Sequence, residues 1–449
     1  MSLDLVLKKS KTLIKKGKSL KKEISYNPNY FLTSWSDTVG YINIKNFCNK
    51  NISVFYKYKI IFREFFSINR DELKVLSYNE KNNYKNLILT YFFPKNLNKD
   101  GSYFDKYTSL NTKFDKKSTL WILIPVNENK FNFRSDKNII IINRFLNNFY
   151  KNFLLTIIYF FKNFFKSFCY RRLEKINFDN TNFSKNLSKI LIKIIKEKKI
   201  KNFLFPYEAQ PHQQFFIKEL KKKNKKLNII GYMHTVIPPL PLDYIKRDGC
   251  PDLLLVNGID QKNILCQKLG WKKNEVKNIT SLRYNIRNNI DFNGNIFFPY
   301  FIEDEKKIFN SFKKLIFSKK KFFFPKLKVK NHPSMQDSLK HKNLKNKIEK
   351  YLLKNKTLFK NKKDNKNISL FFGSTASVIE CLERGSRAFH ICCDPDLEKF
   401  DNYFWKRLKI FKIDENIFEY RLKRKGKIIN ISKQTKKNLN LKKNFLTKV

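Results

Sequence analysis

The chain has 449 residues, of which 42% are hydrophobic and 16% aromatic, so it holds enough apolar material for two or three buried cores. This composition excludes a disordered chain, and 11 Gly and 13 Pro exclude collagen-like and low-complexity proteins. The formal net charge is +56, carried mostly by lysines spread along the whole chain. That pattern disfavours nucleic acid as the main ligand and favours attraction to anionic lipid or to phosphorylated substrates.

The first 118 residues are irregular, and we assign them to the N-terminal part of the domain that follows. A buried strand is predicted at 120–126, where an apolar run is bounded by polar residues. A basic aromatic helix is predicted at 144–172, either as a core helix or as one lying on an anionic membrane surface. Its longest apolar run, Phe153–Phe161, is too short to span a bilayer.

From about residue 185, predicted helices and strands alternate. Strands are expected at 202–205, 227–232, 252–256, 295–299, 326–330, 368–372 and 388–392, and helices at 185–197, 211–223, 260–269, 304–317 and 376–384. This alternation predicts an α/β fold with two Rossmann-like, doubly wound parallel-sheet domains that face a cleft. The domains are placed at 119–288 and 289–420, with a basic, frayed tail at 421–449.

Several familiar motifs are missing. The chain has no phosphate-binding P-loop, no G-x-G-x-x-G and no G-x-S-x-G. Its seven cysteines form no C-x-x-C pair, so no zinc ribbon is predicted, and a reducing cytoplasm fits them. The start has no long apolar segment of the signal-peptide type. Asp394-Pro395-Asp396 has the spacing of a metal-diphosphate motif, but Asp-Pro is also typical of a turn, so no metal or other cofactor is predicted.

The sequence Gly373-Ser374-Thr375-Ala376-Ser377 joins a predicted strand to a predicted helix. A glycine turn, small hydroxyl residues and exposed backbone N–H groups favour a bound phosphate at this position. Glu380, on the first turns of the helix, is a candidate acceptor for ribose hydroxyls. The alternative is an ordinary helix N-cap, where Ser and Thr are common.

His332-Pro333 follows another predicted strand directly. Because proline restricts the preceding residue to an extended backbone, the imidazole is expected to point into the ligand crevice and bind a diphosphate. The alternative is a surface histidine in a turn.

A third polar cluster begins where the strand at 202–205 ends. Glu208 is a candidate general base, and Gln210, His212 and Gln213 are candidates for binding a hydroxyl-rich acceptor. His234 ends the next strand and is expected to line the same cleft as a second catalytic candidate. The alternatives are a capping role for Glu208 and a structural, buried role for His234.

Taken together, these pieces resemble GT-B glycosyltransferases of bacterial surface-polysaccharide synthesis. The group resembled includes sialyl- and polysialyltransferases, Kdo transferases and CDP-glycerol glycerophosphotransferases, which have a His-Pro pair followed by a Ser-rich turn. His332-Pro333 and the turn at 373–377 match these signals, and the resemblance covers roughly residues 185–400. The acidic-acidic-Gly motif that carries the base in sialyltransferases is missing.

The resemblance implies transfer of a sugar or polyol phosphate from a CMP- or CDP-linked donor to a surface-glycan or lipid-linked acceptor, without a metal. His332 and the turn would bind the donor phosphate, and Glu208 would be the base. The implied location is cytoplasmic, with possible contact at the inner membrane. Two other functions stay open: a non-catalytic binder of polyanions or nucleic acid, and a sugar-nucleotide epimerase of the same fold.

Overall fold

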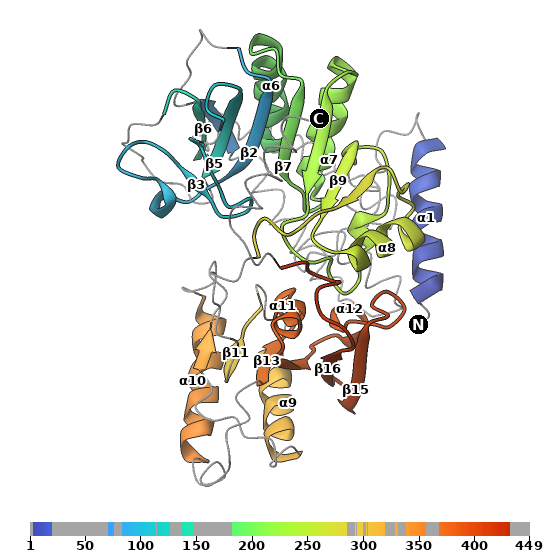
Figure 1. Cartoon of the computed structure of the whole chain (residues 1–449). Helices are drawn as coiled ribbons and strands as arrows, with labels where there is room; N and C mark the ends of the chain where they lie inside the picture. The colour runs from blue at the N-terminus through green and yellow to red at the C-terminus, as the bar shows by residue number, and fades with distance from the viewer. Residues whose placement is uncertain are drawn as a thin grey trace, which may run out of the picture.

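The computed structural model describes residues 3–19, 71–75, 83–113, 115–125, 136–146, 182–284, Phe292, 294–299, Ile302, 304–318, 328–330, 338–355 and 368–431. These residues form two lobes, and each lobe is built on one large sheet (Figure 1). The predicted fold class, α/β with two parallel-sheet units, is confirmed.

The first sheet has eight strands in the order β1-β6-β5-β2-β7-β8-β9-β10. All neighbouring strands are parallel except the pair at the edge, β1 and β6. The strands are β1 Asp71–Val75, β2 Asn86–Phe92, β5 Thr119–Pro125, β6 Ile139–Leu146, β7 Asn202–Pro206, β8 Asn228–Tyr232, β9 Leu253–Val256 and β10 Val276–Asn278.

Strand β2 lies in the middle of this sheet, although the sequence had indicated only irregular structure before residue 119. Leu87 and Leu89 belong to one apolar cluster and Ile88 to another, so both faces of the strand are buried. A strand buried on both faces is a nearly continuous apolar run without alternation, which is hard to recognise between Lys- and Asn-rich neighbours.

The second sheet has six strands in the order β12-β11-β13-β14-β16-β15. The first four are parallel, as predicted, whereas β16 and β15 add antiparallel strands that the sequence analysis missed. The strands are β11 Asn295–Phe297, β12 Lys328–Lys330, β13 Ile368–Phe372, β14 Arg387–Ile391, β15 Leu408–Asp414 and β16 Ile417–Leu422.

Helices cover the sheets through their apolar faces. α6, α7 and α8 contribute to the cluster on one face of the first sheet, and α9 and α10 pack on one face of the second sheet while α11 covers the other. The helices are α1 Leu3–Ser19, α6 Asn182–Glu197, α7 Pro211–Lys223, α8 Ile259–Lys268, α9 Glu305–Ser318, α10 Leu339–Lys354, α11 Ser377–Glu383 and α12 Pro395–Glu398. Helices α1, α10 and α12 were not predicted from the sequence.

Two predicted segments need correction. The helix expected at 144–172 begins inside strand β6, because Arg144–Leu146 are its last residues. Residues 147–172 lie outside the described residues, so the choice between a core helix and a membrane-surface helix stays a prediction. The tail from 421 is not frayed throughout: 421–422 complete β16, and Ile428 and Ile429 are fully buried.

Segment 426–431 lies between the two lobes. On one side, Glu383 of α11 accepts hydrogen bonds from the backbone N–H groups of Gly426, Ile428 and Ile429. On the other side, Gln261 of α8 donates to the carbonyl of Ile428 at 2.9 Å. The same apolar cluster contains residues of both lobes, so the lobes share a buried contact.

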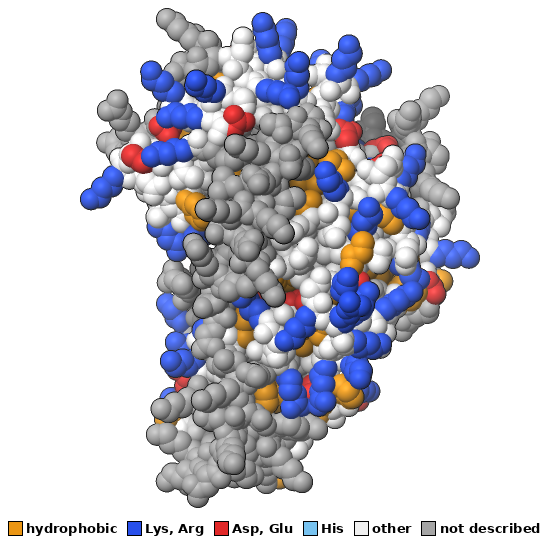
Figure 2. Space-filling model, viewed as in Figure 1, with side chains coloured by type: hydrophobic (Ala, Val, Ile, Leu, Met, Phe, Trp, Pro, Cys, Tyr) orange, Lys and Arg blue, Asp and Glu red, His pale blue; other side chains and the backbone are white. Residues whose placement is uncertain are grey.

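Lysine and arginine side chains are scattered over the described part of the visible face rather than gathered in one stripe (Figure 2). This distribution agrees with a charge spread along the chain. Among the described helices, none is both long enough and apolar enough to cross a membrane.

Gly231 in β8 is a position where a side chain has no room. A Cβ atom there would lie 2.8 Å from Cβ of Tyr207 and 2.9 Å from Cγ of Pro251. We expect Gly231→Ala to lower the free energy of unfolding by about 1–3 kcal/mol, because overpacking a rigid core forces its neighbours apart. Urea denaturation of the variant and parent measures this, and equal stability would show that Tyr207 can shift freely.

Candidate functional site

Two adjacent strands of the first sheet bring the candidate catalytic residues together. β7 and β8 are parallel, and Pro206 lies opposite Tyr232 at their carboxyl ends. Glu208 and His234 each follow two positions later, so both leave the same edge of the sheet at the same level. The sequence singled out both residues, and the register of the strands explains why they meet.

Glu208 and His234 are in direct contact. Nε2 of His234 lies 3.2 Å from Oε1 of Glu208, and Nε2 of Gln210 donates to Oε2 of Glu208 at 2.9 Å. The side chain of His234 is 2% exposed and that of Glu208 is 22% exposed. The carboxylate is therefore the part of the pair nearer to solvent.

Burial and pairing together set the charges of these two groups. Burial lowers the pKa of His234 below its usual value, and the neighbouring carboxylate of Glu208 opposes this shift without cancelling it. Burial raises the pKa of Glu208, but hydrogen bonds from His234 and Gln210 and the charge of His212 outweigh it, so the net pKa is lowered. At neutral pH the pair is a carboxylate beside a neutral imidazole.

The loop that carries Glu208 is strained and tightly bonded. Ala209 has a φ of +57°, a left-handed conformation that costs a non-glycine residue about 1–2 kcal/mol. Oε1 of Gln213 accepts from the backbone N–H groups of Glu208 and Gln210, and its Nε2 donates to the carbonyl of Pro206 at 2.7 Å. Gln213 is buried and holds this loop in shape, which is a different task from the acceptor binding predicted for it.

A hairpin that the sequence analysis did not place completes the surroundings of His234. It consists of β3 Phe104–Asp105 and β4 Leu110–Asn111. Asp105 is fully buried and accepts hydrogen bonds from Thr90 and from Thr108, which fixes the turn. In that turn, the ring of Tyr107 meets the ring of His234 edge to face, with centroids 4.4 Å apart at 84°.

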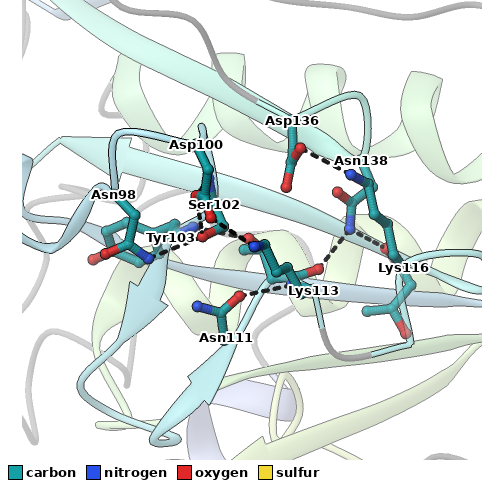
Figure 3. A network of polar contacts seen from close by, with 11 residues as sticks. Asn98, Asp100, Ser102, Tyr103, Asn111, Lys113, Lys116, Asp136 and Asn138 are labelled. Atoms are coloured by element: carbon teal, nitrogen blue, oxygen red, sulfur yellow. Dashed lines mark hydrogen bonds and ion pairs between the residues drawn. The ribbon is translucent and has the colours of Figure 1, made fainter.

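Polar contacts link the segments on either side of the hairpin, and one of them joins this region to the start of β6 (Figure 3). Nζ of Lys113 lies 2.6 Å from Oδ2 of Asp100, and Asn98 donates to the hydroxyl of Ser102 at 2.9 Å. Asn138, directly before β6, donates to the backbone carbonyl of Thr112 at 3.0 Å. These contacts hold the hairpin, and therefore Tyr107, in place beside His234.

The predicted phosphate turn lies at the carboxyl end of β13 in the second lobe. Gly373 has a φ of +60°, and a Cβ atom there would meet Cγ of Pro299 at 3.0 Å, so both the turn and the close contact require glycine. The side chain of Ser374 is exposed, and those of Thr375 and Ser377 are half-buried. Oγ1 of Thr375 accepts from the backbone N–H of Ser377 at 3.3 Å, which is the contact of an ordinary N-terminal turn.

His390 of β14 supports this turn through a hydrogen bond to Gly373. Because the residue lies inside a strand, this role was not predicted from the sequence. His390 is fully buried, and its Nε2 lies 2.6 Å from the carbonyl oxygen of Gly373. Burial lowers the pKa of His390 to about 4, so the ring is neutral and donates to that carbonyl.

Glu380 is buried rather than open to a ribose. Its Oε1 accepts from Nε of Arg384 at 3.0 Å and from Nη2 at 2.9 Å. Arg283, which the sequence analysis also missed, interacts electrostatically with Glu380 and with His234. Its guanidinium lies 6.0 Å from the centroid of Tyr107. Arg283 therefore lies close enough to interact with both His234, at the edge of the first sheet, and Glu380, in α11 of the second lobe.

Two predicted donor residues, His332 and Pro333, lie outside the described residues, and their roles stay predictions. Within the part of the chain that the structure describes, no group of three or more His, Cys, Asp or Glu side chains is arranged to hold a metal ion.

No protein-family model and no curated protein matches the chain. Among solved structures, it is similar to an α,α-trehalose 6-phosphate synthase from Burkholderia multivorans (9% identity, 65% of this chain and 76% of that chain, TM-score 0.35). It is also similar to a glycosyltransferase from Rickettsia africae (12% identity, 72% of this chain and 89% of that chain, TM-score 0.34). Likeness at such TM-scores supports no argument about function, which therefore depends on the site.

Proposed function

We propose that the protein is a metal-independent glycosyltransferase of the GT-B type. It transfers a sugar or a polyol phosphate from a nucleotide-activated donor, CMP- or CDP-linked, to a surface-glycan or lipid-linked acceptor. The observation that carries the proposal is the contact between Glu208 and His234 at the carboxyl edge of the first sheet. Ligands of open α/β sheets bind at this edge.

The acceptor side of the proposed site is the loop around Glu208. The carboxylate is partly exposed, its pKa is lowered, and Gln210 holds one of its oxygens. His212, in the first turn of α7, adds a group whose charge acts on the same carboxylate. A base beside polar amide and imidazole groups suits a hydroxyl-rich acceptor.

The donor side is the turn at 373–377. Its hydroxyl side chains are at least partly exposed, whereas its backbone is held from below by His390 and from the side by Pro299. A rigid turn with exposed or half-buried hydroxyl groups suits a phosphate, because the turn is already formed when the anion arrives. His332 remains the proposed partner for the same phosphate.

The reaction is a substitution in which atoms and charges balance. The Glu208–His234 pair takes the proton of the acceptor hydroxyl, and the acceptor oxygen forms a bond to the transferred carbon or phosphorus. The bond from that atom to the nucleotide phosphate oxygen breaks, and the nucleotide leaves with the electron pair. Donors at the turn stabilise the charge that develops on the leaving phosphate.

A thermal-shift panel with CMP, CDP, UDP and GDP tests the donor half of the proposal. We expect CMP or CDP to raise Tm most, because the proposed donor is CMP- or CDP-linked. A ligand at about 100 times its Kd stabilises the folded state by about 2.7 kcal/mol. The matched variant Ser374→Ala with Ser377→Ala should fold normally but lose most of this shift, since each hydrogen bond to a charged group contributes about 1.5–3 kcal/mol.

Other outcomes separate the rival functions. Stabilisation by heparin that falls steeply with salt, with no nucleotide effect, would favour a polyanion binder. Interconversion of free nucleotide sugars without an acceptor would favour an epimerase. If no nucleotide shifts Tm, the donor site at 373–377 is wrong.

A further inference from the structure

The contact with Glu208 fixes the tautomer of the His234 ring. A carboxylate accepts hydrogen bonds and donates none, so Nε2 of His234, 3.2 Å from Oε1, carries the ring proton. Because the lowered pKa of His234 keeps the ring neutral, its other nitrogen, Nδ1, holds an unprotonated lone pair.

This lone pair has no partner within the described part of the chain. Nδ1 of His234 is buried from solvent and makes no hydrogen bond there. An unsatisfied buried acceptor is rare in folded proteins, and each one calls for a cause such as a catalytic role. The two nitrogens of the ring therefore differ: Nε2 is bonded to Glu208, whereas no described residue donates to Nδ1.

The groups around the ring favour a neutral base. The charge of Arg283 disfavours protonation, whereas the carboxylates of Glu208 and Asp105 favour it, and burial outweighs them. Tyr107 contacts the ring and is only half-buried, and His212 acts on the paired carboxylate. Because Nδ1 is buried, a substrate must displace a neighbouring side chain to reach it, and the half-buried Tyr107 is one described residue whose ring contacts His234.

We infer that Nδ1 of His234 is the atom that accepts the proton of the substrate hydroxyl, and that Glu208 is a positioning residue which orients the ring. The inference depends on the proposed function and sharpens it. The hydroxyl proton moves to Nδ1, the oxygen electron pair forms the new bond, and the imidazolium that results is stabilised by the carboxylate 3.2 Å away.

Histidine-selective ¹⁵N labelling tests the tautomer without any substrate. The chain has five histidines, so the spectrum is simple, and the signal missing from His234→Gln identifies His234. We expect a neutral ring protonated at Nε2 at pH 7, with a pKa below 6.5. A ring protonated at Nδ1 would overturn the inference, whether or not a donor substrate has been found.

The variant Glu208→Gln tests the positioning role in the same spectrum. Its amide has one oxygen to share between two donors, His234 and Gln210, so we expect the His234 ring to lose its single Nε2-protonated form. An unchanged tautomer and an unchanged pKa in Glu208→Gln would remove Glu208 as the positioning residue.

The rate of nucleotide release from CMP- and CDP-linked donors then separates the two candidate bases. His234→Gln places an amide N–H near Glu208, so the carboxylate keeps a donor while the imidazole base is gone. We expect its kcat to fall about 10²–10⁴-fold with nucleotide-induced Tm shifts intact. A rate within a few-fold of the parent would make Glu208 the base and overturn the inference.

The pH profile gives a second readout. In the parent, the rate should fall as pH drops through a value below 6.5, because protonated His234 accepts no proton. If the donor panel gives no turnover while the ring is protonated at Nε2, the proposed function fails and the tautomer assignment stands on its own.

Discussion

Replacing Gly258 with alanine is expected to lower the free energy of unfolding by about 3 kcal/mol. Gly258 lies between β9 and α8, and a Cβ atom there would be 1.9 Å from the carbonyl oxygen of Ile428. This neighbour is backbone, so it cannot rotate away as a side chain would. We expect the added methyl group to push segment 426–431 off the first lobe, and with it the buried side chains of Ile428 and Ile429.

Guanidinium denaturation measures the loss, and amide hydrogen exchange locates it at 426–431. The matched control is Gly426→Ala in the same segment. Gly426 has a φ of +73°, but a Cβ atom there would have no heavy atom of the described residues within 4 Å, so we expect only backbone strain of about 1–2 kcal/mol. If the two variants lose equal stability, the close contact at Gly258 is unimportant.

The regular half of the chain was predictable because its signals are local. The sequence predicted the helix at 211–223 and the strand at 368–372 with the bounds that the structure has. Proline at the start of the helix, and a run that is apolar except for Ser369 in the strand, mark these elements without help from tertiary contacts. By contrast, β15 and β16 form an edge hairpin with many Lys, Arg and Glu side chains. Such charged segments are hard to tell from a basic tail in the sequence.

The candidate site was predictable where it depends on strand ends. Glu208 and His234 meet because two parallel strands are in register, and a sequence that alternates strand and helix implies such an edge. Tyr107 and Arg283 were not predictable, because both are far from His234 in sequence. Tyr107 comes from the β3–β4 hairpin, and Arg283 comes from the chain after β10. No local pattern carries information about that kind of contact.

Glu383 is the second position with a large expected effect. Its buried carboxylate accepts from the backbone N–H groups of Ile428 at 2.8 Å, Ile429 at 3.1 Å and Gly426. Glu383→Ala leaves three backbone donors without this partner. Because each buried donor left unsatisfied costs about 1–3 kcal/mol, we expect a loss of at least about 3 kcal/mol in the free energy of unfolding.

Glu383→Gln is the graded control for this variant. Its amide oxygen can replace Oε1, which receives Ile428 and Ile429, but its NH₂ group then faces the N–H of Gly426. We expect Glu383→Gln to lose less unfolding free energy than Glu383→Ala. Amide exchange should become faster at Gly426 and change less at Ile428 and Ile429. Equal exchange in Glu383→Ala and the parent would show that Glu383 does not hold the segment.

Combining Glu383→Ala with Gly258→Ala tests whether the contacts of segment 426–431 with the two lobes depend on each other. Glu383 holds it from the second lobe, and Gly258 lets it approach the first lobe closely. Once either contact releases the segment, little stability remains for the other change to remove. We therefore expect the double variant to lose clearly less than the sum of the single losses, whereas full additivity would mean that the two contacts act independently.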